Sequence, residues 1–381
     1  MFNLSKEQEE RAMRLHKESI VVDTLAWTGV TLSSEFTPSI PKRANELVKS
    51  GVSFSVIIQE LERMHADDLI SGRSDIEREW MKLSGVDVLH LTASYPLASF
   101  EDTLANIALW QRKFDSLDYL VKATTFKDIE QAKAQDKRAI IMGFQDSEYF
   151  GRNFHRLQLF YDLGIRIIQL TYNIRNLIGS GCTERADGGL SLFGVEIVRR
   201  MNKLGIVVDL SHCGYQTTMD GIEVSSSPVA VTHSFCRKLH DHDRGKTDEQ
   251  IQALAAKNGY FGVLTVPFFL SDLSQRQATL NDVLDHIEHV AGVMGIDKVG
   301  IGTDNPGPAL EPLVTKLKEL SVAMGFRKEH QVIPDALLQG YRDRREWPNI
   351  TRGLVSRGYS DVEIEGILGG NFLRLFKEVV G

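Results

Sequence analysis

The chain has 381 residues, 42% of them hydrophobic and 25% charged, with 44 lysines and arginines against 51 aspartates and glutamates, a net charge of −7. This composition is typical of a globular protein and excludes a disordered chain, while the acidic balance excludes an electrostatic nucleic-acid binder. Three cysteines are too few for a disulfide framework, the charged N-terminus is no secretory signal, and no apolar stretch is long enough to cross a membrane. The sequence therefore predicts a cytoplasmic protein.

Short β-branched apolar runs alternate with amphipathic stretches along the chain. Near-continuous apolar runs are typical of strands that are buried on both faces of a parallel sheet. We expect eight such strands, at residues 19–23, 52–57, 139–145, 166–172, 206–212, 228–233, 260–266 and 298–304. Helical spacing of apolar residues recurs between them, at 193–204, 248–258 and 282–294. With no GxGxxG motif after the first strand, the alternation predicts a (β/α)8 TIM barrel, an α/β fold, rather than an open doubly wound sheet.

Two segments are longer than ordinary barrel connections. Residues 58–120 are expected to hold extra helices and an inserted strand at 86–92, and residues 307–346 follow the eighth strand. Because no linker or compositional shift divides the chain, we expect one barrel domain over residues 1–381 that carries both insertions. Long segments of this kind are typical of lids or partner surfaces, and an oligomer contact is an equally good interpretation.

Polar side chains follow most of the predicted strands, at the end where a barrel places its active site. They are Asp23, Gln145, Tyr172, Asn173, His212, His233 and Asp304. Two histidines on adjacent strands could ligate one divalent ion, because zinc favours nitrogen ligands. Asp304 could take a proton from water and pass it to a leaving amine. Cys213 and Cys236, which flank the histidines, are further candidate ligands.

Long segments of the chain have a family pattern: LGIRIIQLTYN, GGLSLFGVEIVRRMNKLGIVVDLSHC, SSPVAVTHS, DHIEHVAGVMGIDKVGIGTDNPG and, near the end, WPNITRGLVSRGYSDVEIEGILGGNFLRLFKEV. In these segments the chain resembles the renal (membrane) dipeptidase family of the amidohydrolase superfamily, whereas residues 58–120 and 307–346 hardly match. The resemblance implies a TIM-barrel hydrolase that cleaves an amide bond in a small carboxylate-bearing substrate.

The resemblance also implies roles for individual residues. His212 and His233 fall on two metal-binding histidines of the family, and Asp304 falls on an aspartate that ligates metal and carries protons. Arg244, in DHDRG, falls on an arginine that binds the substrate carboxylate through a bidentate pair. Tyr172 replaces a substrate-contacting histidine and is expected to donate to an oxyanion, with Asn173 as a neighbouring substrate contact.

The chain departs from the family at other ligand positions, which makes it a divergent branch. Asp23 opens the first-strand motif D-G-H-x-D, but Leu25 and Trp27 replace its ligating histidine and aspartate. Gln145 replaces the glutamate that bridges two metal ions, and an amide lacks the charge that holds two cations together. We therefore expect no binuclear centre and at most one ion, zinc or another divalent metal, on the two histidines with Gln145 or Asp304; a metal-free site is the alternative.

Three functions follow from these residues. The leading one is a dipeptidase-like hydrolase with His212, His233, Asp304 and Tyr172 as catalytic groups. The second is a metal-independent lyase, isomerase or decarboxylase on a small amino-acid-like or betaine-like molecule. The third is a non-catalytic homologue. The expected partner is a small-molecule substrate, with no nucleic acid or membrane, and family analogy adds a homodimer.

Overall fold

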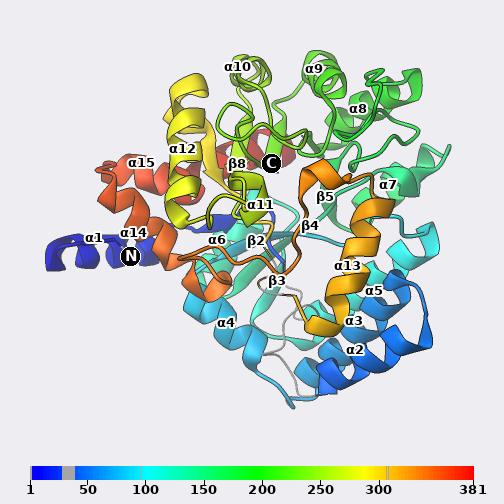
Figure 1. The fold of residues 1–381 in the computed structure, drawn as a ribbon, viewed down its shortest axis with the longest axis horizontal. Coiled ribbons are helices and arrows are strands. Elements are labelled where there is room, and N and C mark those ends of the chain that lie inside the picture. The colour runs from blue at the N-terminus through cyan, green and yellow to red at the C-terminus, as the bar shows by residue number, and fades with distance from the viewer. Residues whose placement is uncertain (1, 28–38, 95, 306, 308) are drawn as a thin grey trace.

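The computed structural model describes residues 2–27, 39–94, 96–305, 307 and 309–381. It has a central ring of parallel strands surrounded by helices (Figure 1). Within these ranges, no helix combines the length and the hydropathy that crossing a bilayer requires.

Eight parallel strands form the barrel wall, and a ninth strand pairs outside this path with β4. The wall strands follow each other as β1 (Val22–Asp23), β2 (Val88–Thr92), β4 (Arg138–Phe144), β5 (Ile165–Gln169), β6 (Val207–Asp209), β7 (Ala230–Ser234), β8 (Tyr260–Val263) and β9 (Val299–Ile301), with β3 (Leu120–Lys122) as the additional strand. The last strand returns to the first, because Thr24 N donates to Ile301 O and Asp304 N donates to Leu25 O, both at 2.9 Å. The predicted TIM-barrel fold is confirmed.

The second barrel strand lies later in the chain than predicted. Residues 52–57, expected as a strand, contain the start of helix α3 (Phe54–Ile70), which Ser53 caps. Ile57, Ile58 and Leu61 of this helix are buried at helical spacing, a pattern that extends beyond the short apolar run used for the prediction. The strand expected as an insertion at 86–92 is β2, which pairs with both β1 and β4.

The helices occupy the connections between strands and the C-terminal region. They are α1 (Lys6–Glu18), α2 (Ser39–Ser50), α3, α4 (Ile76–Ser84), α5 (Phe100–Ser116), α6 (Phe126–Ala134), α7 (His155–Asp162), α8 (Leu192–Leu204), α9 (Tyr215–Val224), α10 (Asp248–Ala256), α11 (Pro267–Leu270), α12 (Leu280–Met294), α13 (Glu311–Ala323), α14 (Pro348–Ser356), α15 (Asp361–Glu365) and α16 (Asn371–Val380). Helices α8, α10 and α12 lie where helical periodicity predicted them.

The two ends of the barrel differ in what covers them. At the amino ends of the strands, Phe372, Leu375 and Phe376 of α16 join an apolar cluster with Val22 and Val88. At the carboxyl side, α13 lies against α2 and α3, although these helices are far apart in the sequence (Figure 1). Their apolar residues, Ile40, Ala44, Leu47, Ile57, Ile58, Leu61 and Leu313 among them, form one cluster. The two long segments therefore meet beside the mouth of the barrel.

Candidate metal and substrate site

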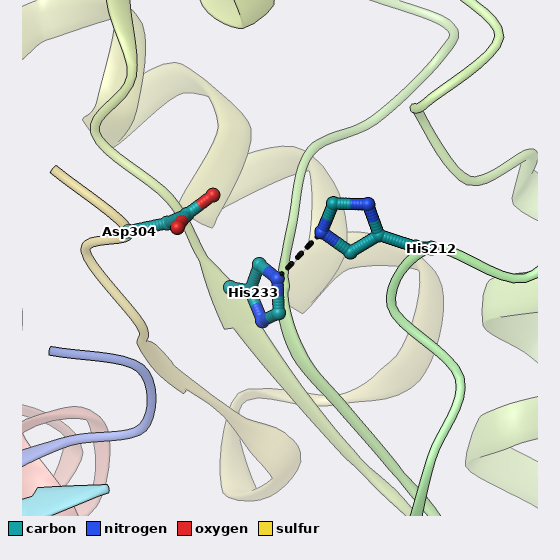
Figure 2. A group of neighbouring side chains, drawn as sticks. All are labelled: His212, His233 and Asp304. Atoms are coloured by element: carbon teal, nitrogen blue, oxygen red, sulfur yellow. Dashed lines mark hydrogen bonds between the residues drawn. The ribbon is translucent and has the colours of Figure 1, made fainter. Parts of the chain in front are cut away.

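Three predicted residues meet at the mouth of the barrel. His212 follows β6, His233 lies in β7 and Asp304 follows β9. One ligand atom from each lies within 4.8 Å of the others (Figure 2). The two imidazoles face each other, with Nε2 of His212 2.9 Å from Nε2 of His233. These are the three side chains that the strand-end pattern singled out.

In each imidazole ring, the hydrogen bond at Nδ1 indicates whether that nitrogen carries the ring proton. Nδ1 of His212 lies 2.6 Å from Oδ1 of Asn173, and a carbonyl oxygen only accepts, so this nitrogen donates. The hydroxyl of Thr232 donates to Asp209 at 2.6 Å, so its oxygen accepts from Nδ1 of His233 at 2.8 Å. In the neutral rings both Nε2 atoms therefore carry lone pairs.

The two Nε2 atoms lie 2.9 Å apart, so a cation between them would bind both rings. A proton is disfavoured in this role, because burial and the charge of Arg244 hold the pKa of His212 and of His233 well below the usual range. Two imidazole nitrogens and a carboxylate are ligands that zinc and similar divalent ions accept. Asn173 and Thr232 fix the rings as outer partners of metal-binding histidines do. The residues present therefore fit one divalent metal ion.

Asp304 is held by Leu25 and Trp27, which follow β1. Nε1 of Trp27 donates to Oδ1 of Asp304 at 3.1 Å. The backbone N of Asp304 donates to the carbonyl of Leu25 at 2.9 Å. The Asp304 φ of 49° lies in the left-handed region that most residues avoid. Burial raises the pKa of Asp304 to about 6, although Arg244 and Trp27 oppose the increase. Leu25 thus holds the backbone of Asp304, and Trp27 holds its carboxylate.

Tyr172 and Gln145 line the same cavity as His212 and Asp304. The Tyr172 ring stacks on His212, with centroids 4.1 Å apart and an interplanar angle of 21°. Burial raises the pKa of the Tyr172 phenol, so the hydroxyl stays protonated and can donate. Gln145 is buried at the end of β4, where its backbone carbonyl accepts from Gln169.

Arg244 is completely buried and is not among the cavity-lining residues. Its Nη1 donates to the carbonyl of Ser211 and its Nη2 to the carbonyl of His233, each at 2.6 Å. Nη1 also lies 3.2 Å from Oγ of Ser234. The guanidinium therefore links the chain segments that carry the two histidines.

The cavity has a volume of about 370 Å³ and lies over the His212 and Asp304 side chains. Much of its wall comes from residues for which sequence analysis gave no site role. They lie at 53–55, at 266–269 and on α13 with the segment up to residue 336. Apolar helical spacing in α13 is visible in the sequence, but nothing in that spacing indicates that the helix faces the active site.

The sequence of this chain matches a known family over most of its length. Residues 9–331 match the model of the membrane dipeptidases, peptidase family M19. The chain belongs to this family. The resemblance seen in the sequence is confirmed, and it places the chain in a family of hydrolases of the amidohydrolase type.

The curated relatives of this dipeptidase-family chain include two fungal proteins. It is 30% identical over 285 residues to "Dipeptidase tcpJ" of Claviceps purpurea, covering 74% of this chain and 61% of that protein. It is 28% identical over 290 residues to "Uncharacterized dipeptidase C965.12" of Schizosaccharomyces pombe, covering 74% of this chain and 64% of that protein. The match thus spans less than two thirds of either relative's length.

Solved structures share the fold over almost the whole chain. An amidohydrolase from Pseudomonas aeruginosa superposes with a TM-score of 0.74 at 29% identity, covering 97% of this chain and 99% of that one. A metallo peptidase from Rhodobacter sphaeroides, solved with a phosphinate mimic of the dipeptide L-Ala-D-Ala, has a TM-score of 0.71 at 18% identity, covering 95% and 100%. The second similarity concerns the fold alone.

Proposed function

We propose that this protein hydrolyses an amide bond in a small dipeptide-like substrate, with one divalent metal ion, zinc by family analogy, at the barrel mouth. The observation that carries the proposal is the pair of facing Nε2 atoms of His212 and His233, 2.9 Å apart. The Asp304 carboxylate lies within 4.8 Å of both. Catalytic metal sites typically have three nitrogen or carboxylate ligands from the protein and leave a further position open for substrate.

His212, His233 and Asp304 would hold the ion, and Gln145, which lines the same cavity, is a further candidate ligand. An ion bound there supplies Lewis acidity toward the scissile carbonyl. The expectation of a single ion is supported by Leu25, whose side chain is buried in the protein interior. It is also supported by Trp27, whose indole donates to Asp304.

The remaining chemistry belongs to the side chains around the cavity. Asp304 accepts a proton from the attacking water and returns it to the leaving nitrogen, which makes it the general base and then the general acid. Tyr172 donates a hydrogen bond to the oxygen on which negative charge develops. Asn173, Thr232 and Arg244 are positioning residues, since their contacts are with the histidines and with the backbone that carries them.

The test combines metal analysis with hydrolysis. Protein purified without chelator is analysed for metal and assayed on a panel of dipeptides and dipeptide amides, before and after chelation and after addition of Zn²⁺. We expect about one ion per chain, loss of activity on chelation and recovery with the metal. Full activity after chelation would overturn the metal part, and the absence of hydrolysis across the panel would overturn the function.

A second arm tests the role of Asp304. Asp304→Asn keeps the shape of the side chain but removes its proton-accepting oxygen, so we expect kcat/KM to fall by about 10²- to 10⁴-fold. Asp115→Asn, an exposed change on α5, is the matched control and should leave kcat/KM unchanged. An Asp304→Asn variant with normal activity would exclude the proposed proton carrier.

A further inference from the structure

We infer that Arg327 is a positioning residue, which clasps the wall segment of the cavity, residues 317–336, to the two loops that support His212 and His233. The inference rests on the proposed function only where it concerns substrate binding, because the clasp itself belongs to the folded chain. Two observations carry it: the place of the wall segment in the cavity, and the contacts that Arg327 and His330 of this segment make with the two loops.

The wall segment supplies the cavity with apolar surface. Leu320 lies on α13, and Met324, Phe326 and Ile333 follow it; all four line the cavity that His212 also lines. Apolar groups of a substrate are stabilised when such surface covers them. The wall segment must therefore be in place for the cavity to bind a substrate tightly.

Both ends of the wall segment are attached to the body of the protein. Before it, Leu313 of α13 packs in the apolar cluster that includes residues of α2 and α3. After it, Gln339 N donates to Ala278 O at 3.0 Å, and Leu280 N donates to Gln339 O at 2.9 Å. Arg327 lies between these attachments, where its contacts decide how closely the middle of the segment approaches the barrel.

Arg327 joins the wall segment to two loops at once. Its Nη2 donates to Oδ2 of Asp243 at 2.8 Å, and its Nη1 donates to the carbonyl of Thr183 at 2.7 Å. Nε2 of His330 donates to the same Asp243 oxygen at 3.1 Å, because its Nδ1 accepts from the backbone N of Arg327. Hydrogen bonds from His330 and Arg327 lower the pKa of Asp243 to about 2, so the carboxylate of the clasp stays charged near neutral pH.

Each of the two loops supports one of the facing histidines. In the first loop, N and Oγ1 of Thr183 donate to the carbonyl of Asn173, whose side chain accepts from Nδ1 of His212. The second loop continues from the clasped carboxylate into Arg244, whose Nη2 donates to the carbonyl of His233. The clasp therefore gives the wall segment a defined place relative to the reacting groups.

The clasp is of a kind that can open and close. The side chains of Arg327 and Asp243 are 39% and 32% exposed, and ion pairs this accessible to water are weak and are screened by salt. The apparent affinity for substrate then depends on the fraction of molecules in which the segment is clasped. Removing the Arg327 charge should lower this fraction, while Arg237 of the same loop, 3.4 Å from Oδ1, still pairs with Asp243.

Hydrogen exchange measured by mass spectrometry tests the clasp without a substrate. In Arg327→Gln we expect amides of the wall segment to exchange at least about fivefold faster than in the wild type, because the segment separates more often from the loops. Lys328→Gln, an exposed change at the next residue, is the matched control and should exchange like the wild type. Wild-type exchange in Arg327→Gln would overturn the clasp.

Steady-state hydrolysis of Leu-Phe tests the effect on binding. We expect KM to rise at least about fivefold in Arg327→Gln and kcat to change less than about twofold, because bound substrate itself holds the wall segment closed. Arg327→Lys, which keeps the charge facing Asp243, should have an intermediate KM, and Lys328→Gln should match the wild type. An unchanged KM in Arg327→Gln would overturn the positioning role. If the wild type cleaves neither Leu-Phe nor any compound of the wider panel, the proposed function fails, and the exchange rates alone decide whether the clasp exists.

A double-variant cycle tests whether Asp243 is the partner. Asp243→Asn should also raise KM, and the variant that combines it with Arg327→Gln should show no more than about the larger single effect, because both changes break the same contact. Effects that multiply in the combined variant would show that the two residues act independently and would overturn this assignment.

Discussion

The two sides of the barrel mouth differ in chemistry, because one supplies Asp304 itself and the other contacts it. The side formed by β6, β7 and β9 supplies His212, His233 and Asp304, whose ligand atoms converge. The side that follows β1 supplies Leu25 and Trp27, which hold Asp304 through a backbone carbonyl and an indole N–H. The comparison shows that residues outside the convergent group can still fix one of its members, here through a backbone carbonyl and an indole N–H.

Each side also has its own way of holding its residues in place. On the histidine side, Asn173 and the pair Asp209 and Thr232 orient each ring through buried hydrogen bonds. On the first-strand side, Leu25 contributes buried apolar surface. We therefore expect changes on the histidine side to affect metal and activity strongly, and changes on the first-strand side to affect stability or, through Asp304, activity to a smaller extent.

The largest effect is expected for His233→Ala. Removing this imidazole leaves His212 without its facing nitrogen, so we expect loss of the bound metal and a fall in kcat/KM of at least about 10³-fold. Metal analysis and hydrolysis assays measure both. His289→Ala on α12, where the histidine bonds Asp248, is the control and should keep its metal. If His233→Ala still bound one metal ion per chain, the histidine side would not be needed to hold the ion, and the contrast between the two sides would be lost.

Leu25→Ala tests the first-strand side. The leucine is 1% exposed, so its truncation leaves a cavity and should lower the free energy of unfolding by about 2–4 kcal/mol. Urea denaturation measures this change, and metal content should stay at the wild-type level. Loss of metal at unchanged stability would show that this side contributes directly to the metal site.

Asp23 gives a pH dependence on the same side. Burial raises its pKa from 3.8 to about 6, so between these values the native protein binds more protons than the unfolded chain, and the contribution of Asp23 to stability falls as pH rises. The fall amounts to about 3 kcal/mol at most. The other titrating groups are common to both proteins, so the free energy of unfolding of the wild type minus that of Asp23→Asn should fall between pH 4 and pH 7. A difference that rises with pH would reverse the sign assigned here.

The smallest effect is expected for Trp27→Phe. This change keeps an aromatic ring but removes the hydrogen bond to Asp304, so we expect kcat/KM to fall about three- to tenfold with metal retained. Trp110→Phe on α5, away from the cavity, serves as the control. Activity equal to wild type would mean that the indole fills space without positioning the carboxylate.

The sequence predicted those parts of the fold that have a strong local pattern. Short β-branched apolar runs located most of the barrel wall, and the polar residues at their ends included His212, His233 and Asp304. The prediction was wrong at 52–57, because six residues of alternating pattern cannot distinguish a strand from the first turn of a helix. It also treated β2 as an insertion, because the long segment before this strand gave no sign that the strand pairs between β1 and β4.

Other features of the site depend on contacts between distant residues. Trp27 and Asp304 are 277 positions apart, so the hydrogen bond between them has no local sequence signal. The hydrogen bonds of Arg244 to the Ser211 and His233 carbonyls likewise depend on how strand β7 packs with the segments after β6 and after β7. The part of the cavity wall on α13 also depends on the packing of this helix against α2 and α3.

The bonds that join β9 to the segment after β1 constrain when the protein can become complete during synthesis. Thr24 N bonds Ile301 O and Asp304 N bonds Leu25 O, so these partners are separated by most of the chain. A ribosome must therefore release residue 304 from its tunnel before the ring can close, while the strands with both histidines have already emerged. Contacts of such long sequence separation are slow to form, and the unfinished ring exposes unpaired strand edges to other nascent chains.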